Sequence, residues 1–130
     1  MRHPSLYQIN TRILLHERSM VLGRAATFDD IPDAYLDRIA AQGFDWVWFL
    51  GVWQTGKASV AVSRRQPELR EACRKSLPDL TDSDICGSPF AIQSYTVHRD
   101  FGGEPSLARM RKRLDCARSA RLQYCLCRLV

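Results

Sequence analysis

Three aspartates crowd one short segment of the sequence and are the first candidates for a metal site. Asp79, Asp82 and Asp84 lie within six residues. A calcium loop draws about six to eight oxygen ligands, and its twelve-residue form closes with a glutamate that this segment lacks. Aspartates in such segments also serve turns and helix caps. We therefore predict turn and capping roles here, and no metal.

The cysteines give no metal site either. There are five of them, at Cys73, Cys86, Cys116, Cys125 and Cys127. An odd count leaves at least one thiol free and does not fit the paired framework of small secreted domains. The last three do not have the gap of about two to four residues that is usual between zinc ligands, and no histidine follows them. The thiols predict a reducing, cytoplasmic environment and no metal or cofactor.

Basic residues concentrate near the C-terminal end of the chain. The formal charge is +5, from 19 basic and 14 acidic residues. After Leu107 the basic residues are Arg109, Arg111, Lys112, Arg113, Arg118, Arg121 and Arg128. A phosphate backbone binds such clusters, so an Arg-rich nucleic-acid-binding module over residues 107–121 is one alternative. The more ordinary interpretation is the solvated face of an amphipathic helix.

The elements that position these residues follow a strand, helix, strand order. Residues 6–10 predict a short strand, and residues 27–43 predict a helix that begins near Asp29 and ends at Gly43. Residues 44–53 are almost continuously apolar, as expected for a strand buried on both faces of a parallel sheet. The order predicts a βαβ unit in an α/β fold.

A long excursion follows between Gln54 and Gly103. It contains one predicted helix, over residues 67–77. A second amphipathic helix opens at Gly103 with Leu107, Met110 and Leu114 on one face, and residues 122–127 predict a third strand. The first residues lack the apolar core of a signal peptide, and no run reaches the length of a membrane span.

With these elements placed, the chain resembles the opening of the alpha-amylase family of glycoside hydrolases over about residues 6–114. Four segments coincide in order with that family's first strand, its first helix and second strand, the tyrosine segment of its second loop, and its next turn and helix. They are residues 7–9, 36–48, 94–98 and 101–114, with Ser94 where the family usually has glycine. The resemblance implies a partial (β/α)8 barrel: a truncated catalytic barrel over 1–130, with two to three βα units, a long loop after the second strand and a divergent tail over 116–130.

The same resemblance implies where a sugar is held. Tyr95 matches the tyrosine that stacks on the sugar beside the cleaved bond, because sugar C–H groups pack on aromatic faces. His98 is a candidate hydrogen-bond partner of a sugar hydroxyl, with a structural role as the alternative. Trp53 and Gln54 follow the predicted second strand, where barrel sites are built. The predicted substrate contacts are therefore Tyr95, His98, Trp53 and Gln54. Other polar or aromatic residues nearby are expected to be structural: Trp46 and Trp48 in the core, Asn10 and Arg12 in support of the barrel mouth.

For function, the resemblance implies hydrolysis or transfer at an α-glucosidic bond, with an α-linked oligosaccharide or glucoside as the partner. Retaining cleavage needs two carboxyl groups that flank the bond, and the family carries them on later strands. A complete barrel has roughly 250 residues, so this chain of 130 is expected to lack them and to be inactive alone. Residues 122–130 also have no Asp, Glu, Asn or His. A non-catalytic remnant is the second alternative.

Overall fold

The chain divides into two compact units. The computed structural model describes residues 3–82, 84–116 and 123–125. The first unit is Met1–Val52 together with Thr96–Val130, and the second is Trp53–Tyr95. Strands and helices occur in both units, which confirms a mixed α/β protein.

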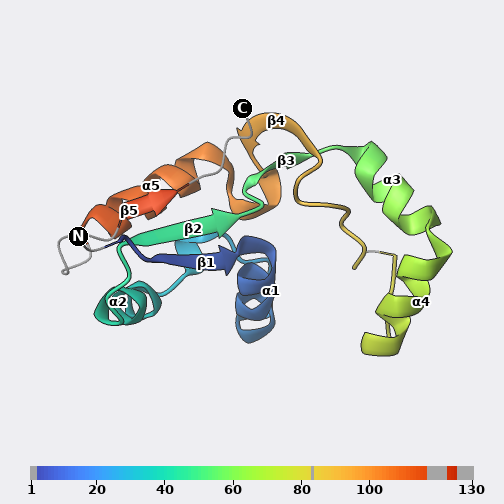
Figure 1. The fold of residues 1–130 in the computed structure, drawn as a ribbon, viewed down its shortest axis with the longest axis horizontal. Helices are drawn as coiled ribbons and strands as arrows, with labels where there is room; N and C mark the ends of the chain where they lie inside the picture. The colour runs from blue at the N-terminus through green and yellow to red at the C-terminus, as the bar shows by residue number, and fades with distance from the viewer. Residues whose placement is uncertain (1–2, 83, 117–122, 126–130) are drawn as a thin grey trace. The chain divides into compact units, whose positions relative to one another are not determined.

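The first unit is built on a parallel sheet whose strand order is β1-β2-β5. The strands are β1 (Leu6–Asn10), β2 (Trp46–Leu50) and β5 (Gln123–Cys125). In the register, Tyr7 lies opposite Val47 and Tyr124 lies on the other side of Val47. Parallel neighbours need crossover connections, and helices supply both of them (Figure 1). The predicted βαβ unit, including the third strand, is therefore confirmed.

The strand β2 is shorter than the sequence predicted. It ends at Leu50, and Gly51, at φ 76°, turns the chain out of the sheet. Along β2 the buried residues are Val47 and Phe49, whereas Trp46 and Trp48 are half-buried. The prediction that both tryptophans form the core was wrong, because successive side chains of a strand point to opposite faces and Val47 and Phe49 occupy the more buried one.

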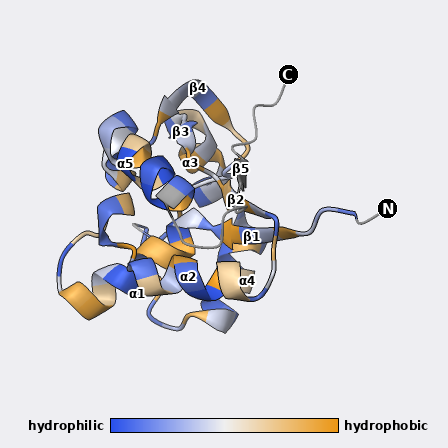
Figure 2. Cartoon of the chain, turned by 90° about the vertical axis from the view of Figure 1, so that its left-hand side faces the viewer, coloured by the Kyte–Doolittle hydropathy of each residue, from blue (hydrophilic) through white to orange (hydrophobic). Residues whose placement is uncertain are grey.

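A helix that the sequence did not predict follows β1 directly. It is α1 (Thr11–Leu22), and Asn10 caps it by accepting a hydrogen bond from the Ile13 N–H at 3.3 Å. Gly23, at φ 66°, ends it. Its buried residues are Thr11, Leu14 and Leu15, while Ile13, Met20 and Val21 are exposed. Apolar residues therefore lie on two faces of α1, which blurs the helical periodicity in the sequence; Figure 2 shows hydrophobic segments on this helix.

The helix predicted over residues 27–43 is two elements. A 3-10 turn η1 (Phe28–Asp30) comes first, and α2 (Asp33–Ala41) follows. Ile31 and Pro32 between them are extended. Gly43 lies just past the end of α2 at φ 80°, so the predicted C-terminal stop is confirmed. Phe28, Leu36 and Ile39 place their side chains in the core.

The last part of the first unit is a turn and a long helix. They are η2 (Arg99–Phe101) and α5 (Gly103–Cys116). Leu107, Met110 and Leu114 are all buried, as the sequence predicted. Gly102 joins the two elements at φ 92°, and a Cβ placed there would lie 2.6 Å from the Ser106 Cβ. Only glycine fits this turn without a shift.

The second unit contains a two-stranded sheet and two helices. They are β3 (Trp53–Thr55), β4 (Ile92–Val97, whose last two residues belong to the first unit), α3 (Lys57–Arg65) and α4 (Pro67–Ser76). The predicted helix 67–77 is confirmed as α4, whereas α3 was not predicted. Neither helix has a buried residue. The long excursion after β2 is thus a folded unit rather than an irregular loop.

Candidate functional site

An aromatic pair joins the two strands of the second unit. Trp53 opens β3, and the centroid of its ring lies 5.7 Å from that of Tyr95 on β4, with the rings at 81°. Trp53 is 9% exposed, while Tyr95 is 41% exposed. Edge-to-face pairs of this geometry are stabilising, and here the buried ring holds the half-exposed one in place. The pair therefore offers a supported aromatic surface to solvent.

Gln54 lies beside this pair in sequence but on the other face of β3. Side chains alternate along a strand, so Gln54 points away from the side that carries Trp53. Its Nε2 donates to the Thr55 carbonyl oxygen at 3.2 Å. Of the four predicted sugar contacts, the structure thus brings together Trp53 and Tyr95 and separates Gln54 from Trp53.

The fourth predicted contact, His98, belongs to the first unit and has structural partners there. The His98 backbone N–H donates to the Val52 carbonyl oxygen at 2.8 Å. The Nδ1 atom of its ring accepts a hydrogen bond from the Asp100 backbone N–H at 3.3 Å and so caps η2. The imidazole packs on the Phe101 ring with centroids 5.1 Å apart. Burial lowers the pKa of His98, and the Asp100 carboxylate partly opposes that shift. These contacts favour the structural role over a sugar contact.

Arg12 completes the group around Phe101. Its guanidinium lies 5.2 Å from the centroid of that ring, and its Nη1 is 4.0 Å from the Asp100 carboxylate. A cation over an aromatic face is attracted by the ring quadrupole. Asn10 ends β1 and caps α1, whereas Arg12 lies in the first turn of α1. Both side chains therefore have local structural contacts, and their expected support of a barrel mouth stays a prediction.

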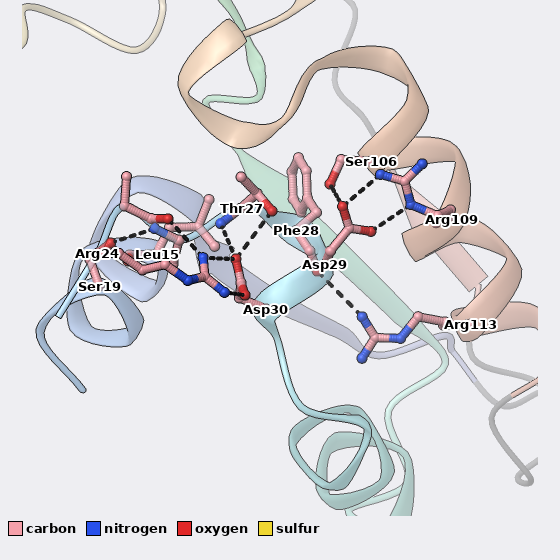
Figure 3. A network of polar contacts seen from close by, with 12 residues as sticks. Leu15, Ser19, Arg24, Thr27, Phe28, Asp29, Asp30, Ser106, Arg109 and Arg113 are labelled. Carbon is pink, nitrogen blue, oxygen red and sulfur yellow. Dashed lines mark hydrogen bonds and ion pairs between the residues drawn. The ribbon is translucent and has the colours of Figure 1, made fainter. Parts of the chain in front are cut away.

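A polar network ties α5 to η1 and to the start of α2, and little in the sequence indicates it; Figure 3 shows its η1 side. Asp29 accepts two hydrogen bonds of 2.7 Å from Arg109 and one of 2.8 Å from the Ser106 hydroxyl. One helical turn along, Arg113 binds Asp33 at 2.6 Å. Arg109 and Arg113 are four residues apart in the sequence, and so are their partners Asp29 and Asp33. This matched spacing was the one available signal, but the pairs are about eighty residues apart in sequence.

Three carboxylates of the first unit, those of Asp29, Asp30 and Asp45, have structural partners. Hydrogen bonding to Arg109 lowers the pKa of Asp29, and hydrogen bonding to Arg24 lowers that of Asp30 to about 2. Asp45, at the start of β2, accepts from the Ser5 N–H and hydroxyl at 2.8 and 3.0 Å. A general acid needs a raised pKa, whereas these partners favour the ionised form. None of these three groups is suited to donate a proton to a leaving group.

The acidic segment near Asp82 likewise has turn and pairing roles. Asp84 accepts hydrogen bonds of 2.7 Å from the N–H and hydroxyl of Thr81, and Asp82 pairs with Arg70 at 2.7 Å. Within the described ranges, no three His, Cys, Asp or Glu residues are grouped as a metal site requires. Cys73 and Cys86 are free thiols. The side chains of Cys116, Cys125 and Cys127 lie outside the described part of the structure.

No helix among the described residues is long and apolar enough to cross a membrane. Comparison with protein-family models, with curated proteins and with solved structures finds no match to this chain. Functional assignment therefore rests on the residues of the chain and their geometry.

Proposed function

We propose that this chain is an alpha-amylase-like carbohydrate-binding protein, the first βα units of a (β/α)8 barrel, that contacts an α-linked oligosaccharide or glucoside through Tyr95. The observation that carries the proposal is the half-exposed Tyr95 ring, supported from below by the buried Trp53 ring at 5.7 Å. Sugar C–H groups pack on such rings, and a ring held by a second ring loses little freedom on binding. Free thiols at Cys73 and Cys86 suit a cytoplasmic location.

The strand arrangement supports the barrel part of the proposal. Three parallel strands in the order β1-β2-β5, each joined to the next through helices, are what the opening of a (β/α)8 barrel requires. In the family resembled, the reaction is hydrolysis or transfer with retention at an α-glucosidic bond. We assign binding, not turnover, to the described residues of this chain, because their carboxylates near β1, β2 and α5 already have structural partners.

The alternative of a nucleic-acid contact on α5 is less favoured by the contacts. Arg109 and Arg113, two of the basic residues on that helix, are paired with Asp29 and Asp33. A phosphate backbone would have to displace both carboxylates. Salt-dependent binding of a DNA or RNA oligonucleotide that is lost on changing Arg109 and Arg113 would favour this alternative instead.

Maltotetraose binding, followed by calorimetry and by tryptophan fluorescence, tests the proposal. We expect Tyr95→Ala to lower the affinity about tenfold or more, and Tyr95→Phe to retain most of it, because stacking needs the ring rather than the hydroxyl. Phe90→Ala is the matched control, since Phe90 is an exposed aromatic residue in the same unit. No saturable binding by the wild-type chain, or an equal loss in Phe90→Ala, would overturn the proposal.

A further inference from the structure

On the helices of the second unit, Arg70 pairs with the Asp82 carboxylate, and Arg64 and Arg74 lie next to Arg70 along the helix pair. The Arg70 Nη1 donates to the Asp82 Oδ1 at 2.7 Å and also approaches the Arg64 carbonyl oxygen at 3.4 Å. Arg74 lies one turn after Arg70 on α4, so the two side chains share a face. Arg64 is the next-to-last residue of α3, close to the start of α4. The geometry thus places Arg64, Arg70 and Arg74, here called the arginine cluster, at one corner of the helix pair.

The charge at this corner is unbalanced. All three arginines lower the pKa of Asp82, with the hydrogen bond from Arg70 as the largest cause and the charges of Arg64 and Arg74 adding to it. Three guanidinium charges therefore act on one carboxylate. On α4, Glu71 pairs with Lys75 at 4.0 Å, and Glu68 lies on the opposite side of the helix from Arg70 and Arg74. A group with two negative charges would balance the cluster better than Asp82 does.

The side chains are also accessible and partly preorganised. Arg64 and Arg74 are exposed, whereas the Arg70 side chain is only 28% exposed and is held by its two hydrogen bonds. The Asp82 side chain is 63% exposed, so another anion can replace it without opening a core. Guanidinium groups match the oxygens of phosphate in a planar, two-pronged geometry.

We propose that Arg64, Arg70 and Arg74 bind the phosphate group of a small phosphomonoester, or inorganic phosphate, at the position held by the Asp82 carboxylate. Arg70 contacts Asp82 directly, and Arg64 and Arg74 flank Arg70 at the end of α3 and one turn further along α4, so a single phosphate group in place of the Asp82 carboxylate is the ligand we infer. Asp82 competes with the ligand for Arg70. This site is separate from Tyr95 and stands whether or not the chain binds a sugar there.

The test uses the full chain with inorganic phosphate and glucose 6-phosphate as probes, followed by calorimetry and by phosphorus NMR. We expect saturable binding in the millimolar range or tighter, and an affinity about tenfold lower in Arg74→Gln, because a charge-assisted hydrogen bond is lost. Asp82→Asn keeps the shape of the side chain but removes its charge, so we expect it to bind phosphate several-fold more tightly. Lys75→Gln is the matched control, since it removes one charge from the same helix outside the cluster.

The two probes separate the sources of the phosphate: tighter binding of glucose 6-phosphate than of inorganic phosphate assigns a sugar ester, and equal binding assigns the phosphate group alone. An affinity unchanged in Asp82→Asn, or lowered as much by Lys75→Gln as by Arg74→Gln, would overturn the proposal. An oligonucleotide that binds more tightly than either probe would also overturn it, if the fall of its affinity with salt concentration corresponds to more than about three phosphate contacts.

Discussion

Asp29 and Arg109 meet through two parallel hydrogen bonds of 2.7 Å although they are eighty residues apart in sequence. Their contact fixes α5 against η1, and Ser106 adds a hydroxyl to the same carboxylate. Bidentate pairs of this kind are the stronger form of ion pair. The Arg109 side chain is 57% exposed and the Asp29 side chain 38%, however, so solvent screens much of the attraction.

We therefore expect Arg109→Gln to lower the free energy of unfolding only slightly, because both partners are largely solvated. Lys112→Gln, an exposed residue of the same helix, is the control and should change it by less than about 0.5 kcal/mol. Urea denaturation measures both. Equal effects of the two substitutions would contradict a specific role for the Asp29 pair, and a shallower salt dependence in Arg109→Gln is a second expected sign.

Asp30 makes the stability of the chain sensitive to acid. Its folded-state pKa is about 2, below the ordinary 3.8, chiefly because Arg24 hydrogen-bonds its ionised form. A lowered pKa contributes stability that is present above the ordinary value and is lost as the pH falls through the folded value. We expect part of the unfolding free energy to disappear between about pH 4 and pH 2.

Asp30→Asn should remove that part of the acid dependence and cost about 1–2 kcal/mol at pH 7, because the Thr27 capping box is lost too. Asp37→Asn, on an exposed position of α2, is the control. Denaturant unfolding at a series of pH values measures the effect. An acid transition in Asp30→Asn that is superimposable on the wild-type one would show that Asp30 is not responsible.

His98 is expected to affect the free energy of unfolding at a higher pH than Asp30 does. Burial lowers its pKa below the ordinary 6.5, so the folded state favours neutral imidazole. Stability from this group is complete above about pH 6.5 and declines as the pH falls below it. NMR titration should show His98 titrating below the ordinary value of 6.5. His98→Asn should keep a cap for η2 yet remove this pH dependence. A His98 pKa at or above 6.5 would contradict this prediction.

Gly102 should be harder to replace than Gly23. An alanine there meets both an unfavourable φ of 92° and a Cβ contact of 2.6 Å with Ser106. Gly23 has a similar φ of 66° but open space around it, so Gly23→Ala isolates the backbone cost. We expect about 1–2 kcal/mol for Gly23→Ala and clearly more, about 2–4 kcal/mol, for Gly102→Ala. Equal costs in thermal or denaturant unfolding would mean that the turn shifts freely.

The chain is expected to show no glycosidase turnover. Retaining cleavage needs a nucleophile and an acid about 5–5.5 Å apart on opposite sides of the anomeric carbon. Asp29, Asp33 and Asp45 are engaged with Arg109, Arg113 and Ser5 respectively. An assay with an aryl α-glucoside and with starch checks this. Release of product that disappears when one acidic residue of the chain is changed would refute it.

β1 was predicted with its observed bounds, and α4 and α5 nearly so. The apolar face of α5 identified that helix, whereas α4 has no buried residue and begins at Pro67 as predicted. α1 was missed because Ile13, Met20 and Val21 are apolar yet exposed, and α3 has no buried residue that would mark a core-facing side. β2 was predicted too long, since the apolar run continues past Gly51 although the backbone turns there.

Of the predicted sugar contacts, Tyr95 was named from the family resemblance and Trp53 from its place after the second strand. The structure brings these two rings together, and their contact with a sugar stays a prediction. Gln54 was placed with Trp53 because they are adjacent, but strand alternation separates them. The arginine cluster could not be predicted, because it depends on how α3 and α4 meet and on a carboxylate several residues beyond α4.

The chain leaves the first unit after Val52 and returns to it at Thr96. A hydrogen bond from the His98 backbone N–H to the Val52 carbonyl oxygen joins these two places. Residues 53–95 are thereby an insertion between two positions that are already joined. The entropy of closing such an insertion depends only weakly on its length, and doubling it costs about 0.6 kcal/mol. Residues can therefore be gained, lost or exchanged around Tyr95 and the arginine cluster while the register of β1 and β2 stays unchanged, so ligand preference and sheet stability can evolve separately in this chain.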